Sequence, residues 1–238
     1  MTASFALRPS LDLSLTSIGQ EGEKLLSVER LMEEPEALVD FAATEVSFAQ
    51  VDGPQGGYPG VRAPAPLDYV GAVVRRLSPA IERAFGLQGV KLGRAECSFS
   101  IVTRHPIELA PLQRVPHVDT TDDLQFALLH YLCGPEKGGT AFYRHRATGY
   151  EIITPERQQH FQAVRDREIA EGSEPSGYIT GDNAHYEQLA SVDAAFDRVV
   201  VYRSRILHSG QIPPDLPLLS DPRRGRLTAN IFISYRPA

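Results

Sequence analysis

Cysteine is scarce in this sequence, with only Cys97 and Cys133 among 238 residues. Two thiols are too few for a disulfide framework or for a zinc site made of thiolates. Their neighbours, Ser98-Phe99 and Leu132, are typical of strand interiors. We therefore expect two buried free thiols.

Long apolar runs and an excess of positive charge are absent as well. No segment is long enough to span a bilayer, and Met1 to Gln20 lacks the unbroken apolar core of a signal peptide. Lys and Arg number 24 against 30 Asp and Glu, and the net charge of −6 argues against a surface that neutralises nucleic-acid phosphates. We expect a cytoplasmic protein that binds neither nucleic acid nor a membrane.

A chain of 238 residues can form one domain with a sizeable core, which is large enough for an enzyme. Glu21 to Phe48 predicts a strand followed by an amphipathic helix, and the Gly- and Pro-rich residues 52–60 predict a loop. Leu67 to Phe85 has the clearest helical periodicity, with Gly86 at the position of a helix cap. We interpret residues 1–92 as a helical N-terminal support.

The second half of the chain predicts mostly strands, because short runs there are rich in β-branched and aromatic residues. These runs cover residues 95–103, 124–133, 140–146, 198–207 and 226–235. Residues 154–197 interrupt them with a charged helix at 155–171, a turn at 172–175 and a second helical piece near 183–189. We expect one domain in which a β core, residues 93–238, carries this helical insertion. No pattern indicates the oligomeric state.

His117-Val118-Asp119 is the most informative short motif. Side chains two residues apart on a strand leave the same face, so this imidazole and this carboxylate can reach one metal ion. The spacing alone is weak, because a chain with 7 His and 30 acidic residues contains about one such pair by chance. A second pair, His185 and Glu187, lies among helical neighbours and is set aside, since residues two apart on a helix point away from each other.

His208, at the end of the predicted strand 199–207, is the candidate third ligand. Two histidines and one carboxylate on one face of an iron ion leave positions open for a co-substrate and dioxygen. Taken without the earlier pair, His208 is more typical of a strand-end imidazole that faces water.

Five features in chain order resemble the iron- and 2-oxoglutarate-dependent oxygenases, within them the prolyl-hydroxylase-like branch. They are His117-x-Asp119, the strand end Tyr131-Leu132, Gly138-Gly139-Thr140-x-Phe142, His208, and Gly225-Arg226-Leu227-Thr228. The resemblance covers about residues 95–238. Further upstream, Tyr58-Pro59-Gly60-Val61-Arg62-Ala63-Pro64 resembles a motif of an uncharacterised bacterial subgroup.

The resemblance implies a fold and a set of cofactors. The fold would be mainly β, a double-stranded β-helix of the jelly-roll or cupin-like kind, with the N-terminal helices on one outer face. Fe(II) would be held by His117, Asp119 and His208. The distal carboxylate of 2-oxoglutarate would be held by Arg226, whose planar fork suits a carboxylate, and by Tyr131; Thr228 shares the strand face of Arg226.

The resemblance also implies a reaction, in which O2 and 2-oxoglutarate yield succinate, carbon dioxide and a hydroxylated substrate. Asp119 favours hydroxylation over halogenation, because halogenating members of the family lack this carboxylate. The substrate stays open between a protein residue, an amino acid and a small natural product. Two alternatives are a non-catalytic binding protein on the same scaffold and a cupin-like metal enzyme that does not use 2-oxoglutarate. The latter would leave Arg226 and Tyr131 without a role.

Other residues with functional chemistry have simpler interpretations. His130 lies in an apolar strand with opposite parity to Tyr131, which is typical of a core imidazole. Tyr143 to Arg146 could line a substrate entrance or form a solvated strand edge. The glycines at 56, 57 and 60 do not join a strand to a helix, so a dinucleotide phosphate cradle is not expected there.

Overall fold

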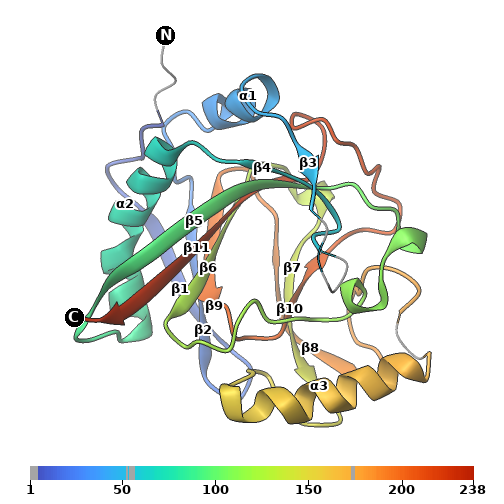
Figure 1. Ribbon diagram of the computed structural model, residues 1–238. Helices are drawn as coiled ribbons and strands as arrows, with labels where there is room; N and C mark the ends of the chain where they lie inside the picture. Colours follow the sequence, from blue (N-terminus) through green and yellow to red (C-terminus); the bar gives the residue numbers. More distant parts are fainter. Residues whose placement is uncertain (1–4, 52, 54–56, 173–174) are drawn as a thin grey trace.

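The computed structural model describes residues 5–51, 53, 57–172 and 175–238 (Figure 1). Its α-helices are α1 (Glu36–Thr44), α2 (Leu67–Phe85) and α3 (Pro155–Ala170). Its strands are β1 (Asp12–Ile18), β2 (Glu23–Glu29), β3 (Ala49–Gln50), β4 (Gly60–Pro64), β5 (Val90–Val102), β6 (Gln125–Tyr131), β7 (Gly139–His145), β8 (Tyr186–Asp193), β9 (Arg198–Arg203), β10 (His208–Gln211) and β11 (Leu227–Pro237). Short 3-10 turns lie at Pro106–Glu108, Pro111–Gln113 and Pro135–Lys137.

The strands form two sheets. The large sheet has the order β1-β2-β9-β6-β11-β5-β4-β3, and the small sheet has the order β10-β7-β8. A further antiparallel bridge joins His117 to His208, so the segment that carries His117 lies beside β10 and extends the small sheet. All pairings between the named strands are antiparallel.

The chain passes between the sheets in the manner of a jelly roll. Starting at β5, it visits the large sheet, the small sheet at His117, the large sheet at β6, and the small sheet at β7 and β8. It then returns to the large sheet at β9, to the small sheet at β10 and to the large sheet at β11. Eight strands in two facing antiparallel sheets with these crossings form a double-stranded β-helix. The predicted fold class is therefore confirmed.

Alternation along the strands separates two apolar cores. On β9, Val199 and Val201 face α2, whereas Val200 and Tyr202 face the small sheet. Because this strand is covered on both faces, its sequence is a continuous apolar run. β11 alternates differently: its odd-numbered residues from Leu227 to Tyr235 are apolar and face α2, and its even-numbered residues face the interior between the sheets. Polar groups can therefore enter the barrel from β11.

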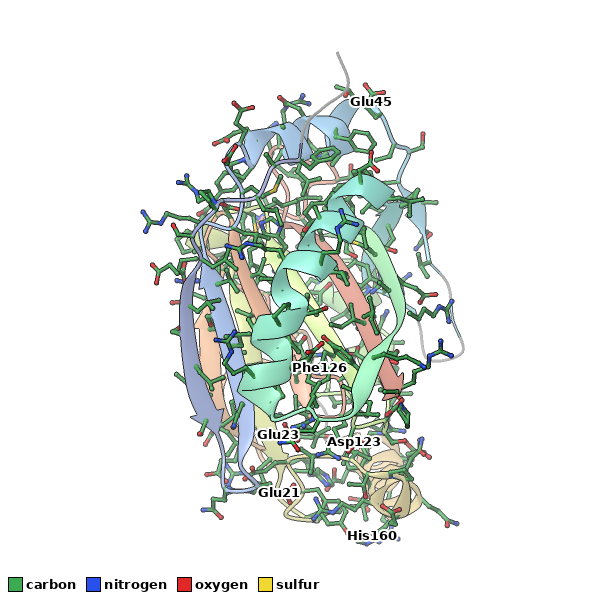
Figure 2. All side chains as sticks on the ribbon, turned by 90° about the vertical axis from the view of Figure 1, so that its left-hand side faces the viewer. Glu21, Glu23, Glu45, Asp123, Phe126 and His160 are labelled. Carbon is green, nitrogen blue, oxygen red and sulfur yellow. The ribbon has the colours of Figure 1, made fainter. Side chains whose placement is uncertain are left out.

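Helix α2 covers the outer face of the large sheet (Figures 1 and 2). Its buried residues recur every three or four positions, as the sequence predicts, and Gly86 ends it in a left-handed conformation with φ 66°. Phe85 packs against Phe126 of β6 with ring centroids 4.8 Å apart, and Figure 2 shows Phe126 beneath this helix.

Helix α3 covers the outer face of the small sheet at its lower end (Figure 1). Phe161 of α3 is in the same buried cluster as Ala141 and Tyr143 of β7. The expected helix at 155–171 is thus confirmed.

The strand and helix predicted within Glu21–Phe48 are present as β2 and α1. Two predictions about secondary structure are wrong. The expected helical support at residues 1–92 also contains the unpredicted strands β1, β3 and β4: β1 and β2 extend the large sheet beyond β9, and β3 and β4 extend it beyond β5. The expected helical piece near 183–189 is instead the start of β8, a strand of the jelly roll itself. β8 escapes detection because it lies at the edge of the small sheet and most of its residues are only partly buried.

Parts of two predicted loops lie outside the described residues, at 52 and 54–56 and at 173–174. Both cysteines are free, as expected, but Cys97 is half-buried and Cys133 is buried. No helix among the described residues is long and apolar enough to cross a membrane.

Candidate active site

Three predicted ligand residues converge between the two sheets. His117 and His208 are directly paired: each backbone N–H donates to the carbonyl of the other at 2.9 Å. The backbone N–H of Asp119 donates to the Ser204 carbonyl at 2.9 Å, which fixes the segment two residues further on. His208 is the first residue of β10, because the chain turns at residues 204–206, whereas the sequence predicts it at the end of a longer strand.

The ligand atoms of these residues lie within 4.8 Å of one another. The Nε2 of His117 is 3.9 Å from Oδ1 of Asp119, and the Nε2 of His208 is 3.7 Å from Oδ2. Two atoms bound to one ion at about 2.1 Å each lie at most about 4.2 Å apart, and the two separations that involve Asp119 are below this limit. Among the described residues, no other group of three His, Cys, Asp or Glu side chains has this arrangement.

Hydrogen bonding and burial favour the neutral, ligating form of His208. Its Nδ1 donates to the Ile206 carbonyl at 2.9 Å, which leaves the Nε2 lone pair directed away from the backbone. Burial lowers the pKa of His208 to about 4, although the bond to Ile206 opposes this. Burial raises the pKa of Asp119, and the neighbouring His117 and Arg62 oppose that rise. The His117 side chain is 54% exposed against 7% for His208, so the cluster is open on the His117 side.

All three ligand residues line a cavity of about 630 Å³. This volume is in the range of small-molecule and cofactor sites. Its wall also includes Tyr58, Arg62, Thr140, Tyr178, Tyr202 and Arg226.

Arg226 places a buried positive charge in this cavity. Arg226 immediately precedes β11 and is 5% exposed. One of its Nη atoms donates a hydrogen bond to the Gly139 carbonyl at 2.8 Å. The Nε has no hydrogen-bond partner, and no acidic group of the described residues pairs with this guanidinium. A buried charge without a counter-ion is unfavourable, and a carboxylate bound in the cavity would supply the counter-ion.

Tyr131 and Thr140 lie beside that guanidinium. The Arg226 Cζ is 5.8 Å from the centre of the Tyr131 ring, and the Tyr131 hydroxyl is 2.6 Å from Oγ1 of Thr140. Burial raises the pKa of Tyr131 to about 12, although Arg226 opposes this, so the hydroxyl stays protonated and can donate. Thr228 is fully buried and its hydroxyl bonds to Oδ1 of Asn230 at 2.8 Å. Neither Thr228 nor Tyr131 is among the residues that line the cavity, whereas Thr140 is.

The strand register places Arg62 on the same interior face. Arg62 of β4 pairs with Ser100 of β5, Ser100 with Thr228 of β11, and Thr228 with Tyr131 of β6. Residues directly opposite each other in antiparallel strands point to the same side, so this row lies on the interior face of the large sheet, and Arg62 is its member that lines the cavity. The motif of residues 58–64 is visible in the sequence, but nothing in it predicts that Tyr58 and Arg62 line the site.

Several other predictions are settled by these contacts. His130 is a core imidazole, as expected: it is fully buried between the Tyr69 hydroxyl at 2.7 Å and Asp197 at 3.0 Å. Tyr143 and His145 are fully buried in the direction of α3, so neither expected alternative, a substrate entrance or a solvated strand edge, is correct for these two residues. His185 lies 3.2 Å from Glu168, away from the cluster.

The fold and the cluster define a double-stranded β-helix with two histidines and one carboxylate in its cavity. The chain belongs to DUF6445, a family of unknown function whose pattern matches residues 9–233. No curated protein matches the chain in sequence.

Several solved structures have a distantly similar fold. HygX from Streptomyces hygroscopicus, with nickel, 2-oxoglutarate and hygromycin B bound, is 12% identical, with a TM-score of 0.46 over 88% of this chain and 82% of that one. The α-ketoglutarate-dependent epimerase SnoN from nogalamycin biosynthesis is 14% identical, with a TM-score of 0.49 over 88% and 78%. An N-substituted L-amino acid dioxygenase from Burkholderia ambifaria is 9% identical, with a TM-score of 0.41 over 94% of each chain. The fold assignment above rests on strand order rather than on these distant similarities.

Proposed function

We propose that the protein is an Fe(II)- and 2-oxoglutarate-dependent oxygenase that hydroxylates a small molecule or a peptide. One observation carries the proposal: the cavity that holds His117, Asp119 and His208 also holds the buried Arg226, which has no acidic partner among the described residues. A set of three metal-ligating residues, taken alone, occurs in many enzymes. Three such residues together with a buried, unpaired guanidinium suit a ligand that chelates the metal at one end and carries a carboxylate at the other.

Each residue has a defined part in this proposal. His117, Asp119 and His208 would hold Fe(II), with the Ile206 carbonyl orienting the His208 ring. Arg226 would bind the distal carboxylate of 2-oxoglutarate, and the Tyr131–Thr140 hydroxyl pair would donate a further hydrogen bond. When bound, the iron and the keto acid would supply the oxidation of a C–H bond by O2, with succinate and carbon dioxide as co-products.

Two finer assignments belong to the same proposal. Membership of the prolyl-hydroxylase-like branch is supported by the order of the motifs from His117 to Arg226. Hydroxylation rather than halogenation is supported by the Asp119 carboxylate, which fills the ligand position that halogenating oxygenases leave open. The free thiols of Cys97 and Cys133 support a reducing compartment such as the cytoplasm.

Anaerobic titration with Fe(II) and 2-oxoglutarate tests the proposal, because the chelate produces a visible charge-transfer band. The wild-type protein should develop the band, and Asp119→Ala should lose it. Asp123→Ala is the matched control, because Asp123, which is labelled in Figure 2, is an exposed carboxylate four residues away and is not one of the three clustered residues. A band that survives in Asp119→Ala would overturn the ligand assignment.

The same titration tests the keto-acid site. A hydrogen bond to a charged group contributes about 1.5–3 kcal/mol, so Arg226→Gln should raise the required 2-oxoglutarate concentration at least about tenfold. Arg223→Gln is its control, since Arg223 is an exposed arginine that pairs with Asp40. Metal binding without any effect of 2-oxoglutarate would favour the cupin-like alternative.

A further inference from the structure

Arg62 is a second guanidinium at the cluster, and the proposed function does not use it. It extends from β4 onto the interior face of the large sheet, in the row described above. It lines the main cavity and also a neighbouring pocket of about 290 Å³, and the two share Arg62, Asp119 and Phe232. Arg62 therefore lies where a molecule entering from the second pocket would meet the metal ligands.

The Arg62 side chain is held in place but its charge is not matched. Its Cζ lies 4.4 Å from the centre of the Tyr58 ring, a cation–π contact. Its Nε is buried and has no hydrogen-bond partner, and no acidic side chain of the described residues forms an ion pair with it. A guanidinium carries five N–H donors, so contact with one aromatic ring leaves donors that can bind a carboxylate.

Charge balance in the cavity points the same way. A divalent cation, the Asp119 carboxylate, the 2-oxoglutarate dianion and the Arg226 guanidinium together cancel. Arg62 is then the one charged side chain among the described cavity residues without a counter-charge. A second anion in the cavity would neutralise it.

We propose that Arg62 binds a carboxylate of the substrate that is oxidised, and so restricts the reaction to acidic substrates. This inference rests on the proposed function, because it assigns 2-oxoglutarate to Arg226. We assign the two guanidinium groups to separate subsites, because β5 lies between β4 and β11 and places the backbones of these two strands about 10 Å apart. Tyr58 acts as a positioning residue that holds Arg62.

Arginine Nε–H resonances test both assignments in one experiment. Protein labelled with 15N is loaded with Zn(II) in place of iron and titrated with 2-oxoglutarate, then with acetate at constant ionic strength. Acetamide is the neutral probe of matching shape. The Arg62 and Arg226 signals are assigned by their loss in Arg62→Gln and Arg226→Gln.

We expect 2-oxoglutarate to shift the Arg226 signal and leave Arg62 in place. Acetate added afterwards should shift the Arg62 signal in a saturable manner, and acetamide should not. Arg94→Gln, which removes an exposed positive charge at the second pocket, should leave the acetate titration unchanged.

The possible failures are distinct. An Arg62 signal that acetate does not move, or that acetate and acetamide move equally, overturns the carboxylate subsite. Loss of the acetate response in Arg94→Gln overturns it as well, because the response would then reflect surface charge. An Arg226 signal that 2-oxoglutarate does not move counts against the proposed function and leaves the reading of the Arg62 signal intact.

Discussion

Removing a single oxygen atom from Tyr69 should measure how strongly α2 is joined to the jelly roll. The Tyr69 hydroxyl donates to Nδ1 of His130 at 2.7 Å, and Nε2 of His130 donates to Asp197 at 3.0 Å. Asp197 in turn accepts the backbone N–H of Met32 with both oxygens, at 3.1 and 3.0 Å. This buried chain of bonds therefore links α2, β6, the start of β9 and the segment after β2.

The size of the effect follows from burial. Tyr69 and His130 are both fully buried, so Tyr69→Phe leaves Nδ1 of His130 without a partner and without access to water. An unsatisfied buried polar group costs about 1–3 kcal/mol. For a chain of this length, each kcal/mol lowers Tm by about 2–4 °C, so we expect Tm to fall by about 2–12 °C.

Tyr186→Phe is the matched control for this prediction. Tyr186 is also buried, at 1% exposed, but its hydroxyl has no hydrogen-bond partner among the described residues. Its removal should change the free energy of unfolding by less than about 0.5 kcal/mol or increase it. Urea unfolding followed by circular dichroism, together with calorimetry, would compare the two variants. Equal losses in both variants would refute the reasoning, because the hydrogen bond would then contribute nothing.

Two further predictions concern Glu151 and Gly138. Although burial raises the pKa of Glu151, the N–H groups of Glu21 and Gln20 and the Arg144 guanidinium lower it below its usual value. The ionised carboxylate therefore stabilises the folded protein at neutral pH, and this stabilisation is lost as the pH falls through the folded-state pKa. Glu151→Gln should lower the free energy of unfolding more at about pH 7 than at about pH 3, as measured by urea titration. Equal losses at the two pH values would contradict this. Gly138→Ala should destabilise more than Gly149→Ala, by calorimetry: both glycines have positive φ, 85° and 72°, but only at 138 would a Cβ overlap a backbone atom, the Gln211 carbonyl. Equal effects would show that β7 and β10 tolerate the intrusion.

Local patterns in the sequence account for the elements that are covered on one face. The apolar periodicity of residues 67–85 predicts where α2 begins and ends, because one stripe of the helix is buried against the large sheet. The alternation on β11 likewise predicts that Arg226 and Asn230 share a face, and both line the cavity. The cluster of His117, Asp119 and His208 is predicted from the sequence through the order of five motifs, because the His-x-Asp spacing by itself is expected about once by chance.

The remaining features depend on contacts between distant parts of the chain. β8 has few buried residues, and only its pairing with β7 makes it a strand of the jelly roll. The role of Arg62 depends on the register that sets it opposite Ser100, which no pattern within residues 58–64 encodes. β1 and β2 are recognisable as part of the large sheet only through the contact of β2 with β9.

Strands from the N-terminal part of the chain pair with both edges of the jelly-roll half of the large sheet, and this limits how far the protein can be shortened. An expression fragment beginning at Val90 would keep every strand of the jelly roll yet leave the outer edges of β9 and β5 bare. Bare edges of this kind recruit other chains and favour aggregation. Such a fragment would also lack α2 and Arg62. If it were insoluble, the cause would be the loss of these N-terminal elements and not a defect in the jelly roll.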